Sequence, residues 1–357
     1  MQLQNNKLDF SSQQFYIGLD VHKKTWTVTI RSMGVELKTF SMQSNPKGVY
    51  EYMKKNYPNG EYFSVYESGF CGYWLHRQLK GFGFKNIVVN PAAVPTSGKE
   101  KLIKLDPIDS RKLARELENK SIESIYIPDE LQQEIRSLSR LRYQQIKKQT
   151  RLKNQIKGYL NFYGHKLPEN CQMQHWSGKF IEYLRSLQFN YEIGREQLDI
   201  YLEELINCRE RLVRTIKALR KYCIDHGFYN DILLMCSAPG IGFITAVTLY
   251  TELMDIKRFP SSEKLACYVG LIPMHRGSGE KLSVLGMRVQ YNRYLRCILI
   301  ESAWIALRKD PALTLAFNQY LKRMSKQEAV VRIAKKLLCR ISYVLKNKKQ
   351  YVYSVIA

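Results

Sequence analysis

Long apolar runs, paired cysteines and acidic residues are scarce in this sequence, and each shortage excludes a class of protein. No apolar run approaches the ~18 residues that a membrane-spanning helix requires. The opening Met-Gln-Leu-Gln-Asn-Asn-Lys lacks the apolar core of a signal peptide. The 8 cysteines form neither a Cys-x-x-Cys pair nor a Cys/His cluster at zinc spacing. We therefore expect a cytoplasmic protein with reduced cysteines and no zinc site.

The shortage of acidic residues makes the chain strongly basic. Its 357 residues include 56 lysines and arginines against 32 aspartates and glutamates, a formal charge of +24. Such an excess predicts a polyanionic partner, most simply nucleic acid. The hydrophobic content of 45% is typical of a folded chain, and the length allows two or three domains.

Four acidic residues occupy similar places in the first part of the chain. Asp20 and Glu67 each end a short apolar strand, Asp106 is a predicted N-cap, and Asp109 follows on the same helix face. The alternation of strands and helices predicts a mixed α/β domain. An unpaired buried carboxylate is costly unless it finds cations or hydrogen-bond donors, and a metal ion is the simplest partner. Each acid taken alone is equally explained as a turn or helix-dipole residue.

The segments that hold these acids resemble one family. Gly-Leu-Asp-Val-His-Lys, Tyr-Glu-Ser-Gly and Asp-Pro-Ile-Asp-Ser-Arg-Lys-Leu-Ala are similar to the DEDD motif of the bridge-RNA-guided insertion-sequence transposases. The resemblance implies a ribonuclease-H-like domain over residues 1–128, similar to the RuvC Holliday-junction resolvase. It also implies that Asp20, Glu67, Asp106 and Asp109 are catalytic and metal-binding, with Mg²⁺, or Mn²⁺ in its place, as the cofactor.

The middle of the chain predicts a long cationic helix. Apolar residues recur at helical spacing from Leu131 to Tyr163, and no acid occurs between Ile135 and Lys166. Solvated helix faces normally mix both signs of charge, so contact with nucleic acid is favoured here. The candidate binding residues on this helix are Arg136, Arg140, Arg142, Lys147, Lys148, Arg151 and Lys153.

A second helical stretch, residues 180–222, is predicted to pack antiparallel to the first. Its exposed side should mix both signs of charge. Residues 129–228 would then form a helical coiled-coil or linker region, which resembles the coiled-coil insertion of the same transposases. Because coiled coils also dimerise, oligomerisation remains open beside nucleic-acid binding.

A Pro-Gly-Ile-Gly turn between two predicted helices is typical of a helix-hairpin-helix element. Gly240 and Gly242 would let backbone N–H groups at a helix N-terminus approach a DNA phosphate. The alternative is an ordinary tight turn between helices.

Ser278 lies between two glycines on a predicted polar loop. A serine in that setting is accessible, although it is most often a turn residue. The segment resembles the C-terminal transposase domain of the same family, in which such a serine is the nucleophile. The resemblance therefore implies a mostly helical transposase domain over residues 229–357 with Ser278 as a catalytic residue. Nearby cations expected to contact nucleic acid are Arg276, Arg288, Arg293 and Arg296. The Asn-x-x-Leu-Arg that follows matches the family, whereas the Lys-Arg-Gly that often precedes it is absent.

The sequence as a whole predicts a transposase of an insertion sequence, nucleoid-associated when bound to DNA. It would cleave and rejoin DNA by metal-assisted phosphoryl transfer through the serine. The expected partners are donor and target DNA, a structured guide RNA and further copies of the chain in a dimer or tetramer. Two alternatives remain open: a metal-dependent junction resolvase or nuclease, and a non-catalytic nucleic-acid-binding protein. A sugar-kinase-like ATPase is disfavoured by the positive charge.

Overall fold

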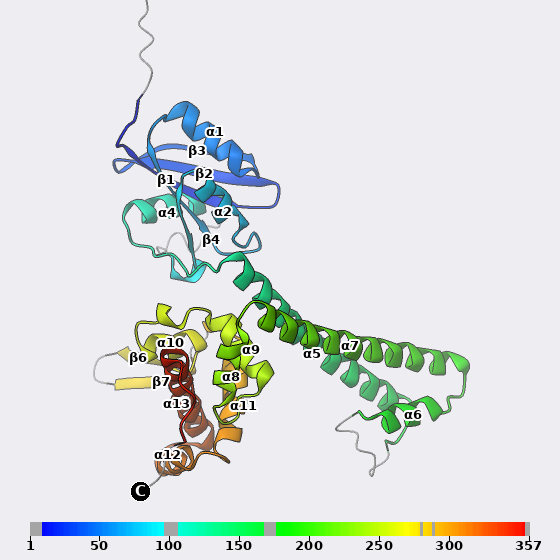
Figure 1. The fold of residues 1–357 in the computed structure, drawn as a ribbon. Coiled ribbons are helices and arrows are strands. Elements are labelled where there is room, and N and C mark those ends of the chain that lie inside the picture. Colours follow the sequence, from blue (N-terminus) through cyan, green and yellow to red (C-terminus); the bar gives the residue numbers. More distant parts are fainter. Residues whose placement is uncertain (1–8, 96–105, 168–175, 279–280, 288–289, 354–357) are drawn as a thin grey trace, which may run out of the picture. The chain divides into compact units, whose positions relative to one another are not determined.

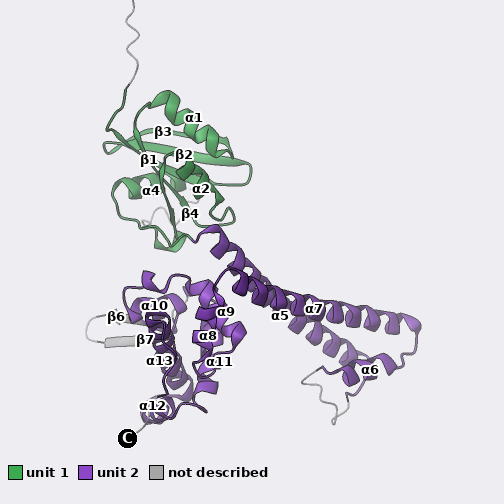
Figure 2. Cartoon of the chain, viewed as in Figure 1, with its two compact units in different colours: residues 1–127 green, residues 128–357 purple. Residues whose placement is uncertain are grey.

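A computed structural model describes residues 9–95, 106–167, 176–278, 281–287 and 290–353, with the backbone alone for the described part of residues 275–285 (Figure 1). The chain divides into two compact units, residues 1–127 and residues 128–357 (Figure 2). Among the described helices, none is both long and apolar enough to cross a membrane.

Unit 1 is built on a five-stranded mixed sheet. Its order is β3-β2-β1-β4-β5; β2 lies antiparallel to β1 and β3, whereas β1, β4 and β5 are parallel. This topology confirms the predicted mixed α/β class and is consistent with a ribonuclease-H-like domain. The strands are β1 (Gln14–Val21), β2 (Thr25–Ser32), β3 (Val35–Gln43), β4 (Glu61–Glu67) and β5 (Lys85–Val89).

Helices cover both faces of this sheet. α1 (Pro46–Asn56) and α2 (Trp74–Gly81) pack on one face, where Phe15, Ile17 and Leu19 of β1 are fully buried. α4 (Asp106–Glu118) packs on the other face with residues of β4 and β5. Because successive strand residues point to opposite faces, the even-numbered positions of β1 face α4. A short 3₁₀ turn, η1 (Pro91–Ala93), follows β5.

A pair of long antiparallel helices opens unit 2. α5 (Glu130–Phe162) and α7 (Glu192–Asp225) lie side by side (Figure 1). Gln145 donates to Thr215 at 3.0 Å and the Tyr159 hydroxyl donates to the Gly194 carbonyl at 2.6 Å, which fixes the antiparallel direction. The single helix predicted over residues 180–222 is wrong, because α6 (Gly178–Ser186) ends before α7 begins.

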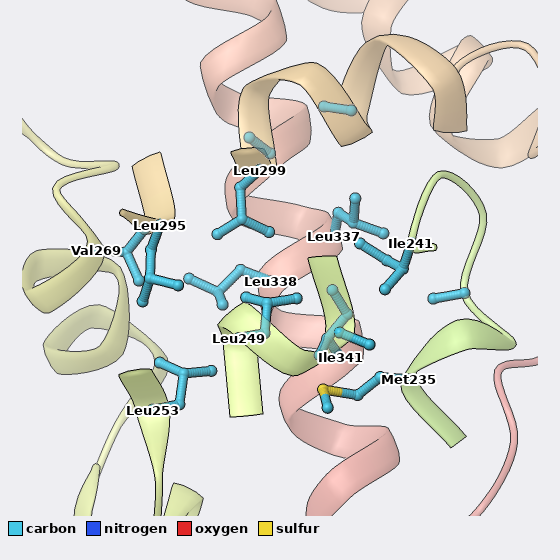
Figure 3. Packing of buried hydrophobic residues seen from close by; sticks show 14 of the residues in the cluster. Met235, Ile241, Leu249, Leu253, Val269, Leu295, Leu299, Leu337, Leu338 and Ile341 are labelled. Atoms are coloured by element: carbon cyan, nitrogen blue, oxygen red, sulfur yellow. The ribbon is translucent and has the colours of Figure 1, made fainter. Parts of the chain in front are cut away.

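The remainder of unit 2 is a helical cluster around α13 (Lys326–Asn347) with one β-hairpin. Leu337, Leu338 and Ile341 of α13 pack against Leu249 and Leu299 (Figure 3). The other elements are α8 (Tyr229–Cys236), α9 (Phe243–Leu253), η2 (Ile256–Arg258), α10 (Ser262–Val269), β6 (Pro273–Ser278), β7 (Lys281–Met287), α11 (Leu295–Ala306) and α12 (Pro311–Leu321).

The core of this cluster continues into the long helices. Ile135 of α5 and Leu219 and Cys223 of α7 belong to the same buried cluster as α13. The apolar core therefore crosses residue 228, where the sequence predicts a domain boundary. α13 contributes its apolar face, including Ile333 and Leu337, to the same core.

A buried ion pair ties α5 to α9. The Glu252 carboxylate is 1% exposed and accepts hydrogen bonds from Arg140 Nε at 2.6 Å and Nη2 at 2.8 Å. Asn292 Nδ2 donates to the same carboxylate at 2.8 Å, and the Tyr268 hydroxyl donates to the Glu252 backbone carbonyl at 3.1 Å. This network joins α5, α9, α10 and the segment before α11.

Replacing Glu252 with glutamine should destabilise unit 2. The variant leaves the Arg140 guanidinium without its counter-charge, and breaking such a pair costs about 3 kcal/mol of unfolding free energy. The matched control is Glu263→Gln, whose 3.7 Å pair with Lys335 is largely exposed, and its effect should stay within about 0.5 kcal/mol. Denaturant unfolding of both variants measures the difference. Equal effects would show that the buried pair is not a significant anchor.

Candidate active site

The close approach of α4 to β1 determines where the carboxylates lie. Gly18 of β1 faces this helix, and a Cβ atom there would lie 2.5 Å from the Ala114 backbone nitrogen and closer still to the Ser110 carbonyl oxygen. No real side chain tolerates that contact, so glycine is required. Since Asp20 is two residues further along the strand, it points to the same face as Gly18, towards the start of α4.

Polar contacts from the antiparallel strands hold α4 in this position. The Thr29 hydroxyl of β2 lies 2.9 Å from the Ser110 hydroxyl in the buried interface. Arg31 Nε donates to Glu118 at 2.7 Å, near the C-terminal end of the helix. The helix is therefore attached along its length, and its first turn is directed at the end of β1.

Asp20, His22 and Asp106 form one cluster of potential metal ligands. His22 Nε2 lies 3.2 Å from an Asp20 oxygen and 3.6 Å from an Asp106 oxygen. One potential ligand atom from each residue lies within 4.8 Å of the others. Burial raises the pKa of the Asp20 carboxyl; His22 opposes this shift, and the charges of Asp106 and Asp109 add to it. The site therefore carries crowded negative charge that a cation would relieve.

Glu67 and Asp109 share a buried lysine. Lys112 Nζ lies 3.0 Å from an Asp109 oxygen and 3.8 Å from a Glu67 oxygen, and its side chain is only 9% exposed. Burial raises the pKa of the Glu67 carboxyl; Lys112 lowers it, and the charges of Asp109 and Asp20 raise it further. The charges of the other three predicted acids thus all interact with Asp20.

His22 and Lys112 are the site residues that the sequence interpretation missed. Both had a usable signal in their spacing. His22 follows Asp20 by two residues, which keeps side chains on one side of an extended segment. Lys112 follows Asp109 by three residues, the spacing that brings side chains together on a helix. Neither residue type alone marks a catalytic site, so tertiary contacts were needed to reveal them.

Ser278 lies at a strand end and not in a loop, which corrects the sequence expectation. It is the last residue of β6, and its backbone pairs with Lys281 at the start of β7. Arg276 is on the same strand, where its backbone pairs with Ser283. The side chains of both predicted residues, and all of Arg288, lie outside the described residues. Ser278 belongs to unit 2 and the four acids belong to unit 1.

Several cations predicted to bind nucleic acid have partners inside unit 2. Arg140 is committed to Glu252, and burial lowers the pKa of the half-buried Arg142. Lys153 lies 5.8 Å from the Trp176 ring, and Arg296 stacks on the Tyr291 ring at 3.3 Å. Arg136 is half-buried and has contacts of its own. The exposed members of the predicted set are Lys147, Lys148, Arg151 and Arg293.

The two glycines of the Pro-Gly-Ile-Gly turn differ in what they contact. Gly240 has a positive φ of 80°, and a Cβ atom there would lie 3.1 Å from the Ser302 carbonyl carbon and closer to its oxygen. Its lack of a side chain is therefore explained by packing against α11. Gly242 is exposed, precedes α9 and has no atom near its missing Cβ. Only Gly242 retains an open approach to its backbone.

Comparison with known families places both parts of the chain in the same group. Residues 17–165 match the DEDD transposase domain of IS110 elements, described as Transposase, and residues 233–318 match the Transposase IS116/IS110/IS902 family. The fold, the carboxylate cluster and these matches define a DEDD transposase. The chain belongs to the IS110 family of insertion-sequence transposases. Membership implies an enzyme that binds DNA, cleaves it and recombines it.

Curated relatives extend this similarity over most of the chain. The chain is 24% identical over 296 residues to the putative transposase y4qE of Sinorhizobium fredii, across 82% of this chain and 72% of that protein. It is 27% identical over 280 residues to the transposase for insertion sequence element IS1111A of Coxiella burnetii, across 75% and 73%. It is 26% identical over 305 residues to the transposase for insertion sequence element IS1533 of Leptospira borgpetersenii, across 82% and 85%.

Replacing Gly18 with alanine should push α4 away from β1 and disorganise the carboxylate cluster. We expect the unfolding free energy of unit 1 to fall by about 1–3 kcal/mol, as for other overpacked cores, and DNA cleavage to be lost. The control is Gly81→Ala, where the added Cβ meets no atom within 4 Å. Thermal unfolding and a cleavage assay compare the variants. A Gly18→Ala protein as stable and active as the control would refute the role of this contact.

Proposed function

We propose that this transposase cleaves and rejoins DNA by metal-assisted phosphoryl transfer through Ser278. In this proposal Asp20, Glu67, Asp106 and Asp109 hold the metal, and a structured RNA encoded by the element selects the sites. The observation that carries the metal part is the cluster of potential ligand atoms from Asp20, His22 and Asp106, and the charges of Asp109 and Glu67 interact with the same Asp20 carboxylate. The family matches support the rest of the proposal.

The donor set fits a hard divalent cation. Carboxylate oxygens are the ligands that Mg²⁺ and Mn²⁺ prefer, and Asp20 and Asp106 supply them beside His22. When bound, such a cation would neutralise phosphate charge and orient the scissile strand. Lys112 would hold Glu67 and Asp109 in place, since its ammonium lies between their carboxylates. His22 would limit the repulsion between Asp20 and Asp106.

The serine would conserve the energy of the broken bond. Its Oγ forms a bond to the phosphorus, its proton passes to a base, and a deoxyribose oxygen leaves as the DNA strand is cut. A deoxyribose hydroxyl then attacks the phosphorus of the phosphoserine, the serine oxygen leaves, and a new DNA strand is joined. One P–O bond forms for each that breaks, so rejoining requires no external energy source.

The partners in this proposal are DNA, a guide RNA and further copies of the chain in a dimer or tetramer. The charge of +24 supports polyanionic partners in general. Exposed apolar side chains on α7, such as Ile193, Ile200 and Val213, support contacts with another protein surface. A nuclease in which water replaces the serine is the second candidate, and the serine experiment below separates the two.

Changing Asp20 to asparagine should abolish cleavage and preserve DNA binding. The amide keeps the shape of the side chain but removes the charge that a divalent cation requires, so we expect a loss of about 10²-fold or more. EDTA should have the same effect on the native protein, and Mn²⁺ but not Ca²⁺ should replace Mg²⁺. The control is Glu51→Gln on α1, where the exposed Glu51 pairs only with Lys47 among the described residues. Undiminished cleavage by Asp20→Asn would reject the metal site.

Changing Ser278 to alanine should prevent a covalent protein–DNA adduct. Native protein, labelled element DNA and the element's noncoding RNA are mixed, denatured and resolved by electrophoresis. The control is Ser283→Ala on the paired strand, which should still form the adduct. If Ser278→Ala joins DNA normally, or if only free hydrolysed ends form with native protein, water is the nucleophile. Omitting the RNA tests guidance, because unguided protein should then lose site choice.

A further inference from the structure

A large groove in unit 2 is lined by residues of α5 and α7. Its volume is about 1330 Å³, and Arg293 and Tyr294, which precede α11, complete its wall. We call it the cationic groove after the side chains that line it: Lys147, Lys148 and Arg151 from α5, Arg211 and Arg214 from α7, and Arg293.

The charge of this groove is almost entirely of one sign. Among the described residues, Glu204 is the one acid that lines the groove, and its carboxylate is paired with Lys148 at 2.7 Å. The six cations are all exposed to solvent. In the described part of the chain, Arg151, Arg211 and Arg214 form no salt bridge. Like charges that face one another across a concavity repel, so the arrangement favours a bound polyanion over an empty solvated surface.

The groove is also held in a fixed shape. Gln145 and Thr215 both line the groove, and Gln145 of α5 donates a hydrogen bond to Thr215 of α7 at 3.0 Å. Tyr143 of α5 makes an edge-to-face contact with Tyr294, with ring centroids 5.0 Å apart, and the Arg140 guanidinium lies 4.7 Å from the centroid of the Tyr294 ring. The wall that carries Arg293 is thereby fixed to α5. A preformed site loses less conformational freedom when a ligand binds.

We propose that the cationic groove, whose lining residues all belong to unit 2, binds the phosphodiester backbone of DNA. The proposal deepens the proposed function and rests on it only for the identity of the polyanion as DNA, which the transposase family supplies. The proposal also assigns DNA binding to one side of α7, although the helix as a whole carries both signs of charge. Arg211 and Arg214 line the groove, whereas Glu203 and Glu210 do not. Contacts of this kind set the position of DNA without reading its sequence.

The decisive experiment removes two groove charges from α7. The full chain with Arg211→Gln and Arg214→Gln is titrated against a labelled DNA duplex of random sequence in EDTA, so that no cleavage is needed for the readout. Two lost phosphate contacts should reduce the slope of log affinity against log salt by about 1.8. The native protein should therefore lose about ten times more DNA affinity between 50 and 200 mM salt than the variant loses.

The control removes two charges from the same helix outside the groove. Lys217 and Lys221 are exposed residues of α7 that do not line it, and Lys217→Gln with Lys221→Gln should leave the salt slope unchanged. A second variant, Arg211→Lys with Arg214→Lys, keeps the charge and should retain most of the binding. An unchanged thermal unfolding curve confirms that each variant is folded.

Two results would overturn the proposal. Equal losses in the arginine and lysine pairs would show that binding follows net charge and not the groove. A loss confined to a labelled RNA hairpin, with DNA binding intact, would assign the groove to RNA. Because the readout is binding in EDTA, failure of Ser278 or of the carboxylates as catalytic residues would leave this test unaffected.

Discussion

The contact between Gly18 and α4 is the constraint on which the candidate active site depends. Strand β1 directs alternate residues to α4, and the absence of a side chain at Gly18 lets the helix backbone reach the strand. This approach brings the first turn of α4 to the end of β1, where Asp20 lies. Any side chain at residue 18 would move Asp106 and Asp109 together away from Asp20, since both are on the same helix. One backbone contact therefore sets the relative placement of three of the four acids.

Electrostatics then explains why this site and the cationic groove suit the same class of substrate. In unit 1, burial and the charges of neighbouring carboxylates raise the pKa of Asp20 and Glu67, and His22 and Lys112 only partly offset these shifts. In unit 2 positive charges are crowded instead, because six cations and one acid line the cationic groove among the described residues. Both arrangements are unfavourable when nothing is bound. A phosphodiester with a divalent cation would relieve the first, and a phosphodiester alone would relieve the second.

Apolar runs and helical spacing in the sequence predicted elements that have a buried apolar side. β1, β4, α4 and α5 were expected close to their observed places. β3 was missed because Val35 and Leu37 are exposed on an edge strand and give no buried face. The break between α6 and α7 was missed because no glycine or proline marks residues 187–191. The β6–β7 hairpin was expected to be a loop, because the glycines around Ser278 are more typical of turns than of strands.

The sequence predicted poorly which lysines and arginines are available to bind nucleic acid. The role of a cation depends on partners that can be distant in the chain. Arg140 was placed on the nucleic-acid face of α5, yet its partner Glu252 is 112 residues away and buried. Conversely, Arg211 and Arg214 belong to a helix whose exposed side was expected to mix both signs of charge. In the structure both arginines line the cationic groove. Tertiary packing thus removes cations from one helix face and adds others from a second helix. The number of cations that can contact phosphate therefore depends on how α5 and α7 pack together, and the sequence of either helix alone does not determine it.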